Sequence, residues 1–515
     1  MRFVIISVLW AALSSTGIYA SQESESPCVS RSSDGVVILA SSKTRFADRE
    51  KCFAKEHVIL KKYRINQASV KKQESSSLQQ MVGLALSGGG IKSSAFQLGL
   101  LSGLHLSKNG NDAPLLYEVD YISSVSGGSW ANGAYVSAPV SDEALFSCLR
   151  EIASADEVSA RCEPLTGLLP DRQNKIKGSG DWQQQIVDSY LQGKSLSLDA
   201  VREQHYREPK RPFPLFLATH SSKIKENKDA ENFPFEFTPL SIGTIADCDT
   251  PETPCGFFRK YLRPLHWNNS PERGFVLELA QAQGVLTKVQ KYGLYEPADK
   301  LLISHAMWAS GALISKVFSL HLHIDKNDEK IEGVRKKYVL SDGGKADNIG
   351  LIPLVERGAD LIILSQIAGD ANSEFGDLER STAQVKRLFG VDVETEALLK
   401  PHKKDGDSHL TITTGCFDNG KGGVSSIILI KPTVRNLAGF YASLKRSRYA
   451  KLMDFLKQEI SSDKSMRFPQ NDTIELGYPK QLIYSYFALG EYIGQTGLSR
   501  ELNRWLAGAG GCAEH

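Results

Sequence analysis

The sequence lacks an excess of charge of either sign. Its 515 residues include 61 Lys and Arg against 59 Asp and Glu, which gives a formal net charge of +2. A nucleic-acid-binding protein normally carries a basic patch or stripe that neutralises phosphates, so this balance argues against a nucleic-acid partner. Hydrophobic residues make up 41% of the chain and charged residues 23%, as in ordinary globular proteins.

Long apolar runs are also missing after the first twenty residues, although a helix needs about 20 apolar residues to cross a bilayer. Residues 1–20, "MRFVIISVLWAALSSTGIYA", combine one Arg, an apolar stretch and a small residue at Ala20. This order is typical of a cleavable signal peptide. We therefore expect an exported protein with no transmembrane segment once the signal is removed. The alternative is an uncleaved membrane anchor.

The short, paired cysteine spacing of a zinc site does not occur in the sequence. All eight cysteines follow Ala20, and their even number suits disulfide formation in an oxidising, extracytoplasmic compartment. Eight cysteines permit 105 connectivities, so the pairing stays open. Proximity along the chain favours Cys28 with Cys52, Cys148 with Cys162, and Cys248 with Cys255, which leaves Cys416 for Cys512.

After the signal, the sequence divides into a polar N-terminal segment and one main domain. Residues 21–78 are polar and charged, and we expect a helical pro-region or arm there rather than core. Residues 79–515 form the main domain, with a polar insertion at about 141–228 that could be a cap or lid, and with a C-terminal helical extension. Elsewhere buried strands and helices alternate, which predicts an α/β fold with a mostly parallel central sheet flanked by helices.

The first glycine turn is "SGGGIKSS", Ser87–Ser94, between the strand pattern "MVGLAL" and a helical pattern. Ile91 precedes Lys92, so the Gly-Lys-Ser/Thr ending of a P-loop is absent, and the dinucleotide spacing Gly-x-Gly-x-x-Gly is absent too. What remains is a run of free backbone N–H groups at a helix N-terminus, which suits a localised negative charge.

The second glycine turn is "SVSGGSW", in which Ser126 follows a strand and precedes a helix. This is the setting of a nucleophile elbow, although Ser124 stands where the usual motif has Gly. A serine nucleophile generates a tetrahedral oxyanion, and the amides of Gly88, Gly89 and Gly90 would stabilise it.

A serine hydroxyl needs a base, and "LSDGGKADN" offers one in Asp342, which follows a strand and precedes two glycines. In a doubly wound sheet the carboxyl ends of the strands converge, so Asp342 can approach Ser126. An ordinary carboxyl titrates near pH 4, so Asp342 must be held against the hydroxyl and partly desolvated to act as a base.

With these three segments in place, the chain resembles the patatin-like acyl hydrolases, and more closely the branch with phospholipase B and the cytosolic phospholipase A catalytic domains. "SGGGIKSSAFQLGLLSGL" looks like the oxyanion segment of that family, "SVSGGSW" its nucleophile elbow, and "SDGGKADNIGLIPLVERGADLII" its aspartate segment. "FEFTPLSIGT" resembles a stretch between the last two. The resemblance covers roughly residues 81–370.

The resemblance implies a patatin-like fold and a Ser-Asp dyad without histidine. Ser126 would be the nucleophile, Asp342 the base, and Gly88, Gly89 and Gly90 the oxyanion hole. Lys92 stands where the family usually has Arg, and could bind the substrate headgroup; a solvated lysine at the helix start is the alternative. Neither a cofactor nor a metal is required.

The implied function is that of an exported phospholipase or lysophospholipase, whose lipid substrate would be met at a membrane or micelle surface. Two alternatives stay open. One is a lipase or esterase of the same fold that acts on non-phospholipid esters, and the other is a non-catalytic lipid-binding protein.

Three further patterns are assigned to structure rather than chemistry. "HLHID", His321–Asp325, could supply two metal ligands, but an exposed strand is expected because no third ligand cluster accompanies it. "GDSH", at 406–409, lacks a preceding apolar strand and is expected to be a loop. The aromatic segment "LIYSYFALGEYIG" could lie on a membrane surface, but glycines interrupt its face, so core packing is expected.

Overall fold

The computed structural model describes ten stretches of the chain apart from short gaps within them, together with the short strands β1 (Val29–Arg31), β2 (Val37–Leu39), β9 (Glu272–Arg273) and β10 (Val276–Glu278). The stretches are 53–71, 80–170, 179–222, 231–248, 286–312, 320–324, 338–369, 375–403, 411–461 and 468–512. The proposed signal peptide at 1–20 lies outside the described residues.

The strand before the first glycine turn lies in the middle of a mixed sheet. This strand is β3 (Val82–Leu86), and it is paired in parallel with β4 (Tyr121–Val125) on one side and β15 (Leu361–Ser365) on the other. β5 (Phe213–Ser222) and β17 (Val424–Lys431) extend the parallel part outwards. The predicted mostly parallel central sheet is therefore confirmed.

Antiparallel strands complete the sheet on both sides of this parallel centre. β16 (Thr411–Asp418) forms one edge against β17. On the other side β14 (Tyr338–Asp342) pairs antiparallel with β5, where the alternating pattern had predicted a parallel strand. Beyond it lie β13 (Leu320–Ile324), β11 (Leu286–Lys291) and β12 (Leu294–Pro297), while β6 (Glu231–Phe237), β7 (Ser241–Thr244) and β10 branch from β5.

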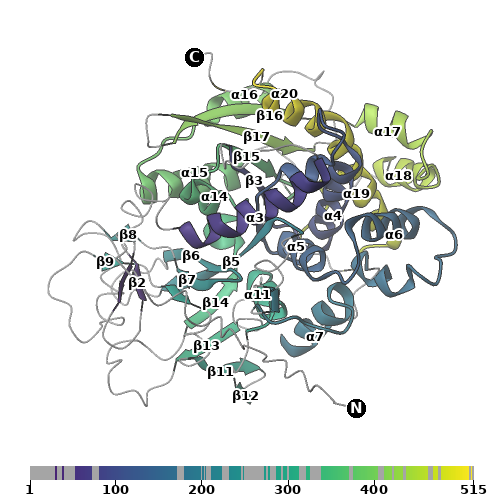
Figure 1. Ribbon diagram of the computed structural model, residues 1–515. Helices are drawn as coiled ribbons and strands as arrows, with labels where there is room; N and C mark the ends of the chain where they lie inside the picture. Colours follow the sequence, from purple (N-terminus) through teal and green to yellow (C-terminus); the bar gives the residue numbers. More distant parts are fainter. Residues whose placement is uncertain are drawn as a thin grey trace, which may run out of the picture.

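Helices cover both faces of the central strands (Figure 1). Successive strand residues point to opposite faces, so Leu84 of β3 joins one buried apolar cluster and Ala85 the other. The first cluster is filled by α4 (Gly90–Leu106), α5 (Gly127–Ser137) and α19 (Lys480–Ile493), and the second by α3 (Ala54–Lys71), α14 (Ile352–Arg357) and α15 (Gly376–Phe389).

The aromatic segment near the C-terminus is α19, and it packs in the core as expected. Its aromatic residues Tyr486 and Phe487 are fully buried. A Cβ added at Gly99 or Gly103 of α4 would collide with the backbone of α19, and one at Gly490 of α19 would collide with α4. The glycines therefore allow the two helices to pack backbone to backbone, which fixes α4 behind the first glycine turn.

The N-terminal arm is helical as expected, but its helix α3 belongs to the core, so the expectation of an arm outside the core is wrong. Ile59, Leu60 and Tyr63 are buried. At the start of α3 the buried Glu56 accepts hydrogen bonds from Arg357 Nε at 2.7 Å and Nη2 at 2.9 Å. Arg357 also binds Glu236, at 2.7 and 2.9 Å. The overall polar composition of this segment concealed the buried face of the helix.

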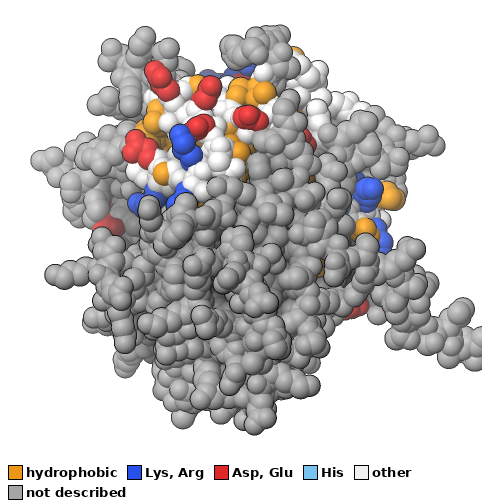
Figure 2. Space-filling view, turned by 90° about the vertical axis from the view of Figure 1, so that its left-hand side faces the viewer, with side chains coloured by type: hydrophobic (Ala, Val, Ile, Leu, Met, Phe, Trp, Pro, Cys, Tyr) orange, Lys and Arg blue, Asp and Glu red, His pale blue; other side chains and the backbone are white. Residues whose placement is uncertain are grey.

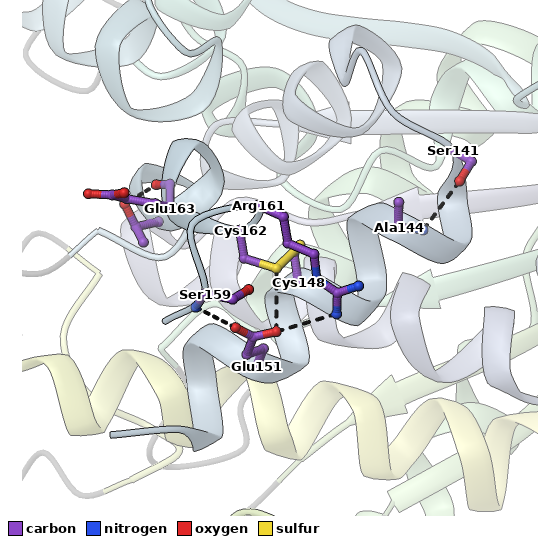
Figure 3. The surroundings of a disulfide bond; sticks show 9 residues. Ser141, Ala144, Cys148, Glu151, Ser159, Arg161, Cys162 and Glu163 are labelled. Atoms are coloured by element: carbon purple, nitrogen blue, oxygen red, sulfur yellow. Dashed lines mark hydrogen bonds and ion pairs between the residues drawn. A yellow bond between two sulfur atoms is a disulfide. The ribbon is translucent and has the colours of Figure 1, made fainter. Parts of the chain in front are cut away.

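The predicted insertion at 141–228 extends too far, because β5 falls inside it and β5 is a central strand. The part before β5 comprises α6 (Asp142–Ser154), a 3-10 helix η2 (Glu163–Leu168) and α7 (Ser179–Tyr190). A disulfide between Cys148 and Cys162 joins α6 to the start of η2 (Figure 3). The role of this region as a cap or lid stays a prediction.

A second disulfide joins Cys416 in the edge strand β16 to Cys512 near the C-terminus. Both described disulfides match the pairing that proximity favoured. The side chains of Cys28, Cys52, Cys248 and Cys255 lie outside the described residues.

The helices and the surface bear on the sequence-based expectations of no transmembrane segment and a balanced charge. No helix in the described part of the chain is long and apolar enough to span a membrane. In the patch of described residues at the top of Figure 2, acidic and basic side chains lie next to one another.

Candidate active site

Ser126 occupies a strained turn between β4 and α5. Its backbone angles are φ 49° and ψ −122°, a conformation that non-glycine residues rarely adopt. A Cβ on Gly127 would collide with the carbonyl oxygen of Gly90, and one on Gly128 would collide with that of Leu86. Only glycine fits after Ser126, and the tight packing holds the serine at the end of β4.

Asp342 reaches Ser126 across β5. In the sheet register Asp342 lies opposite Ala218 of β5, while Val125 lies opposite the preceding residue, Leu217. The end of β4 and the end of β14 therefore lie on either side of Ala218. The Ser126 hydroxyl donates a hydrogen bond of 2.9 Å to Asp342 Oδ2. The end of β14 lies level with the end of β4, although β14 runs antiparallel to β5, because both strands end opposite the middle of the long strand β5.

Burial raises the pKa of the Asp342 carboxyl to about 6, although hydrogen bonds from the Gly344 N–H and the Ser126 hydroxyl and the nearby charge of Lys345 act in the opposite direction. The Gly344 N–H donates to Oδ1 at 2.7 Å, which leaves Oδ2 for the serine. A carboxyl with this pKa is a far better base near neutral pH than an exposed one.

The three glycines of the first turn divide into two kinds. Gly89 and Gly90 have φ values of 139° and 65°, and no described residue accepts a hydrogen bond from either N–H. The Gly88 N–H instead donates to the Asn348 carbonyl at 2.9 Å. Because that donor is already used, the assignment of Gly88 to an oxyanion hole needs correction. Gly89 and Gly90 remain the candidates.

Lys92 does not lie in solvent, although it is in the first turn of α4. Its side chain is fully buried, and its Nζ donates a hydrogen bond to the backbone carbonyl of Asn471. Burial and the nearby Lys431 lower the pKa of Lys92 to about 7, against the smaller, opposite effect of Asp472. The solvated alternative is therefore wrong. Headgroup binding by Lys92 stays a prediction.

Two residues that support the site were missed in the sequence. Ser310, the last residue of α11 (Ile303–Ser310), accepts a 2.8 Å hydrogen bond from the Ser126 N–H. Asn348 joins two of the turns, because its carbonyl accepts from Gly88 and a Cβ on Gly88 or Gly344 would clash with its side chain. Asn348 is the last residue of the "LSDGGKADN" segment, so the sequence could have indicated that it lies near the site. No comparable sequence signal pointed to Ser310.

No histidine is hydrogen-bonded to Ser126 or Asp342 in the described part of the chain. The hydrogen bonds of the Ser126 hydroxyl and the Asp342 carboxylate there involve each other and Gly344, and no histidine takes part. No group of three or more possible metal ligands was found in the same part of the chain. His321 and His323 lie in strand β13, as expected, but their side chains are outside the described residues, as is the GDSH segment.

The central part of the chain, which carries both turns, matches a known family of acyl hydrolases. The family model for patatin-like phospholipases matches residues 84–355, which is more than half of the chain and includes Ser126 and Asp342. The chain belongs to the patatin-like phospholipase family.

A solved structure with a TM-score above 0.5 agrees on the fold. The human GIVD cytosolic phospholipase A2 is 14% identical with a TM-score of 0.51, and the match covers 90% of this chain and 64% of that one. The same human protein in complex with methyl gamma-linolenyl fluorophosphonate is 15% identical, with a TM-score of 0.45 and coverages of 88% and 64%. This chain thus spans less than two thirds of the human protein. No curated protein sequence matches it significantly.

Proposed function

We propose that this protein is an exported serine acyl hydrolase that cleaves carboxylic esters of phospholipids or lysophospholipids. The observation that carries the proposal is the 2.9 Å hydrogen bond from the hydroxyl of Ser126, on a strained turn, to the buried carboxylate of Asp342. Membership of the patatin-like phospholipases supports a lipid ester as the substrate.

In the first half of the reaction, the Ser126 oxygen attacks the ester carbonyl while its proton passes to Asp342 Oδ2. The carbonyl oxygen becomes an oxyanion, which the Gly89 and Gly90 N–H groups stabilise. The intermediate then collapses, and Asp342 returns the proton to the departing alcohol oxygen. An acyl group remains on Ser126, and the alcohol half of the lipid leaves.

In the second half, Asp342 removes a proton from a water molecule, which attacks the acyl carbonyl. A second oxyanion forms in the same place and collapses, and the proton passes to Ser126. The fatty acid is released and the serine is restored. Two features of the site favour both steps. Burial raises the pKa of the Asp342 carboxyl and so makes it a better base, and the strained Ser126 backbone holds the hydroxyl at the end of the strand.

Export is the second part of the proposal. The two described disulfides, Cys148–Cys162 and Cys416–Cys512, support an extracytoplasmic compartment, since disulfides persist in oxidising environments. The pattern of residues 1–20 supports removal of a signal peptide.

The direct test is analysis of lipid products from the purified mature protein beside its Ser126→Ala variant. We expect the wild type to release fatty acid from phospholipid or lysophospholipid vesicles and the variant to release none. Hydrolysis of small esters or acylglycerols without turnover of either phospholipid class would instead identify a lipase or esterase of the same fold. Lipid binding without any hydrolysis would identify a binding protein.

A further inference from the structure

Two backbone segments from distant parts of the sequence pack against the candidate oxyanion turn. The Cβ position of Gly89 is 3.5 Å from the Cα of Ala368, just after β15. The Cβ position of Gly90 is 2.5 Å from the carbonyl oxygen of Thr473, in the segment that precedes α19. Both segments therefore border the backbone that carries the Gly89 and Gly90 N–H groups.

A buried lysine holds each of these segments. Lys92 Nζ donates to the carbonyl of Asn471, two residues before Thr473. Lys431, at the end of β17, donates from Nζ to the carbonyl of Ala368 at 3.4 Å. Both lysine side chains are fully buried. Burying a lysine is costly unless its donors are satisfied, and each of these hydrogen bonds offsets part of that cost.

The segment held by Lys92 is itself fixed from several sides. Asn471 Oδ1 accepts a 2.6 Å hydrogen bond from the Tyr486 hydroxyl of α19. The Tyr478 hydroxyl donates to the Asp472 carbonyl, and Gln470 Nε2 donates to the Pro432 carbonyl at 2.8 Å. Thr473 therefore presents its carbonyl to Gly90 from a rigid support. Asn471 is also a glycosylation sequon, but its side chain is buried and bonded within the fold.

We propose that Lys92 and Lys431 are positioning residues that clamp the two segments onto the oxyanion turn, rather than contacts for the substrate headgroup. The inference rests on the proposed hydrolase function. It explains why Lys92, two positions after Gly90 in the first turn of α4, is buried in the protein. A residue that orients the oxyanion donors affects the hydrolysis of every ester, whereas a headgroup contact affects only substrates that carry a phosphate.

The test compares Lys92→Met, Lys431→Met and the near-isosteric Tyr486→Phe with the wild type on two substrates. One is phospholipid in mixed micelles, and the other is a small neutral ester such as p-nitrophenyl butyrate. We expect kcat to fall about 100-fold for the lysine variants on both substrates with little change in KM, because small displacements of oriented groups cost about that much. Tyr486→Phe should show a smaller loss of the same kind.

Arg150→Met is the matched control. Arg150 is a buried cation that bonds to Ser102 in the C-terminal half of α4, away from the glycine turn. It should lower the melting temperature to a similar degree without changing kcat. If the lysine variants do not fold, Tyr486→Phe decides, since it removes only one hydroxyl from the support of Asn471.

Three results would overturn the inference. A loss restricted to phospholipid would assign Lys92 to the headgroup. Unchanged kcat in the folded variants, or in Tyr486→Phe where the lysine variants fail to fold, would make the clamp irrelevant to catalysis. If the wild type shows no hydrolysis that depends on Ser126, the proposed function fails and the inference falls with it. Failure of the proposed function can be distinguished from failure of this inference, because the wild type and Ser126→Ala reveal it before any lysine variant is compared.

Discussion

Gly127 lies directly against the carbonyl group of Gly90, so the turn that carries Ser126 and the candidate oxyanion turn touch through their backbones. The proposed nucleophile and the candidate oxyanion donors therefore do not need a third element to set their separation. Any side chain at position 127 would force the two turns apart. This contact leads to the first prediction.

Gly127→Ala is expected to abolish hydrolysis and to destabilise the fold by about 1–3 kcal/mol, the usual cost of overpacking a tight site. The new methyl group would meet the Gly90 carbonyl oxygen and displace the oxyanion turn. Gly110→Ala is the control, because no atom lies within 4 Å of its Cβ position. Urea unfolding and ester hydrolysis measure both effects. Full activity in Gly127→Ala would contradict the packing described here.

The activity should follow the ionisation of Asp342. Burial raises the pKa of this carboxyl to about 6, and only the carboxylate can take the serine proton. As pH rises through 6, the fraction of ionised Asp342 grows and kcat/KM increases. Below pH 6, kcat/KM should fall by about tenfold per pH unit. The measurement is a pH profile of kcat/KM with a neutral substrate.

An ordinary histidine titrates near the same pH, so the profile needs its own control, although burial lowers the pKa of His220 to about 4. His220 in β5 and His305 in α11 are the buried histidines on the elements beside the dyad. His220→Gln and His305→Gln should keep the inflection near pH 6, whereas Asp342→Asn should lose activity. A single histidine variant that is folded yet as inactive as Ser126→Ala would favour a Ser-His-Asp triad instead.

The N-terminal helix should be needed for stability. Glu56→Ala leaves the buried Arg357 with Glu236 as its one acidic partner among the described residues, and breaking a buried ion pair costs about 3 kcal/mol or more. The exposed pair of Asp454 with Lys457 provides the control, and Asp454→Ala should change little. Chemical unfolding measures both variants. Equal effects would show that α3 is dispensable, as a removable pro-region would be.

The mature protein is expected to start near Ser21 and to contain disulfides. Removing a native disulfide typically costs about 2–5 kcal/mol, so Cys416→Ser and Cys148→Ser should both lower the free energy of unfolding. Intact mass before and after reduction and alkylation, on protein recovered from its native compartment, gives the start of the chain and the number of bridges. A retained N-terminus with eight free thiols is the contrary result.

Much of the site follows from local sequence signals. Glycines after a buried strand require a tight turn wherever they occur, so both glycine turns and the places of Ser126 and Asp342 at strand ends could be predicted. Proximity in the sequence also predicted the pairing of Cys148 with Cys162.

The rest depends on contacts between distant segments, which a single sequence does not encode locally. The antiparallel direction of β14 is set by its pairing with β5, more than a hundred residues earlier. The burial of Lys92 depends on the segment at Asn471, and the use of the Gly88 N–H depends on Asn348. The buried ion pair of Glu56 could not be predicted either, because its partner Arg357 is on another helix.

The central claim is that Ser126 is a nucleophile that depends on Asp342, and covalent labelling by a fluorophosphonate tests it most directly. We expect the wild type to gain one adduct, which peptide mapping places on Ser126. Ser126→Ala should gain none, and Asp342→Asn should react far more slowly while remaining folded. No labelling of the folded wild type, a label on another residue, or equally fast labelling of Asp342→Asn would contradict the account.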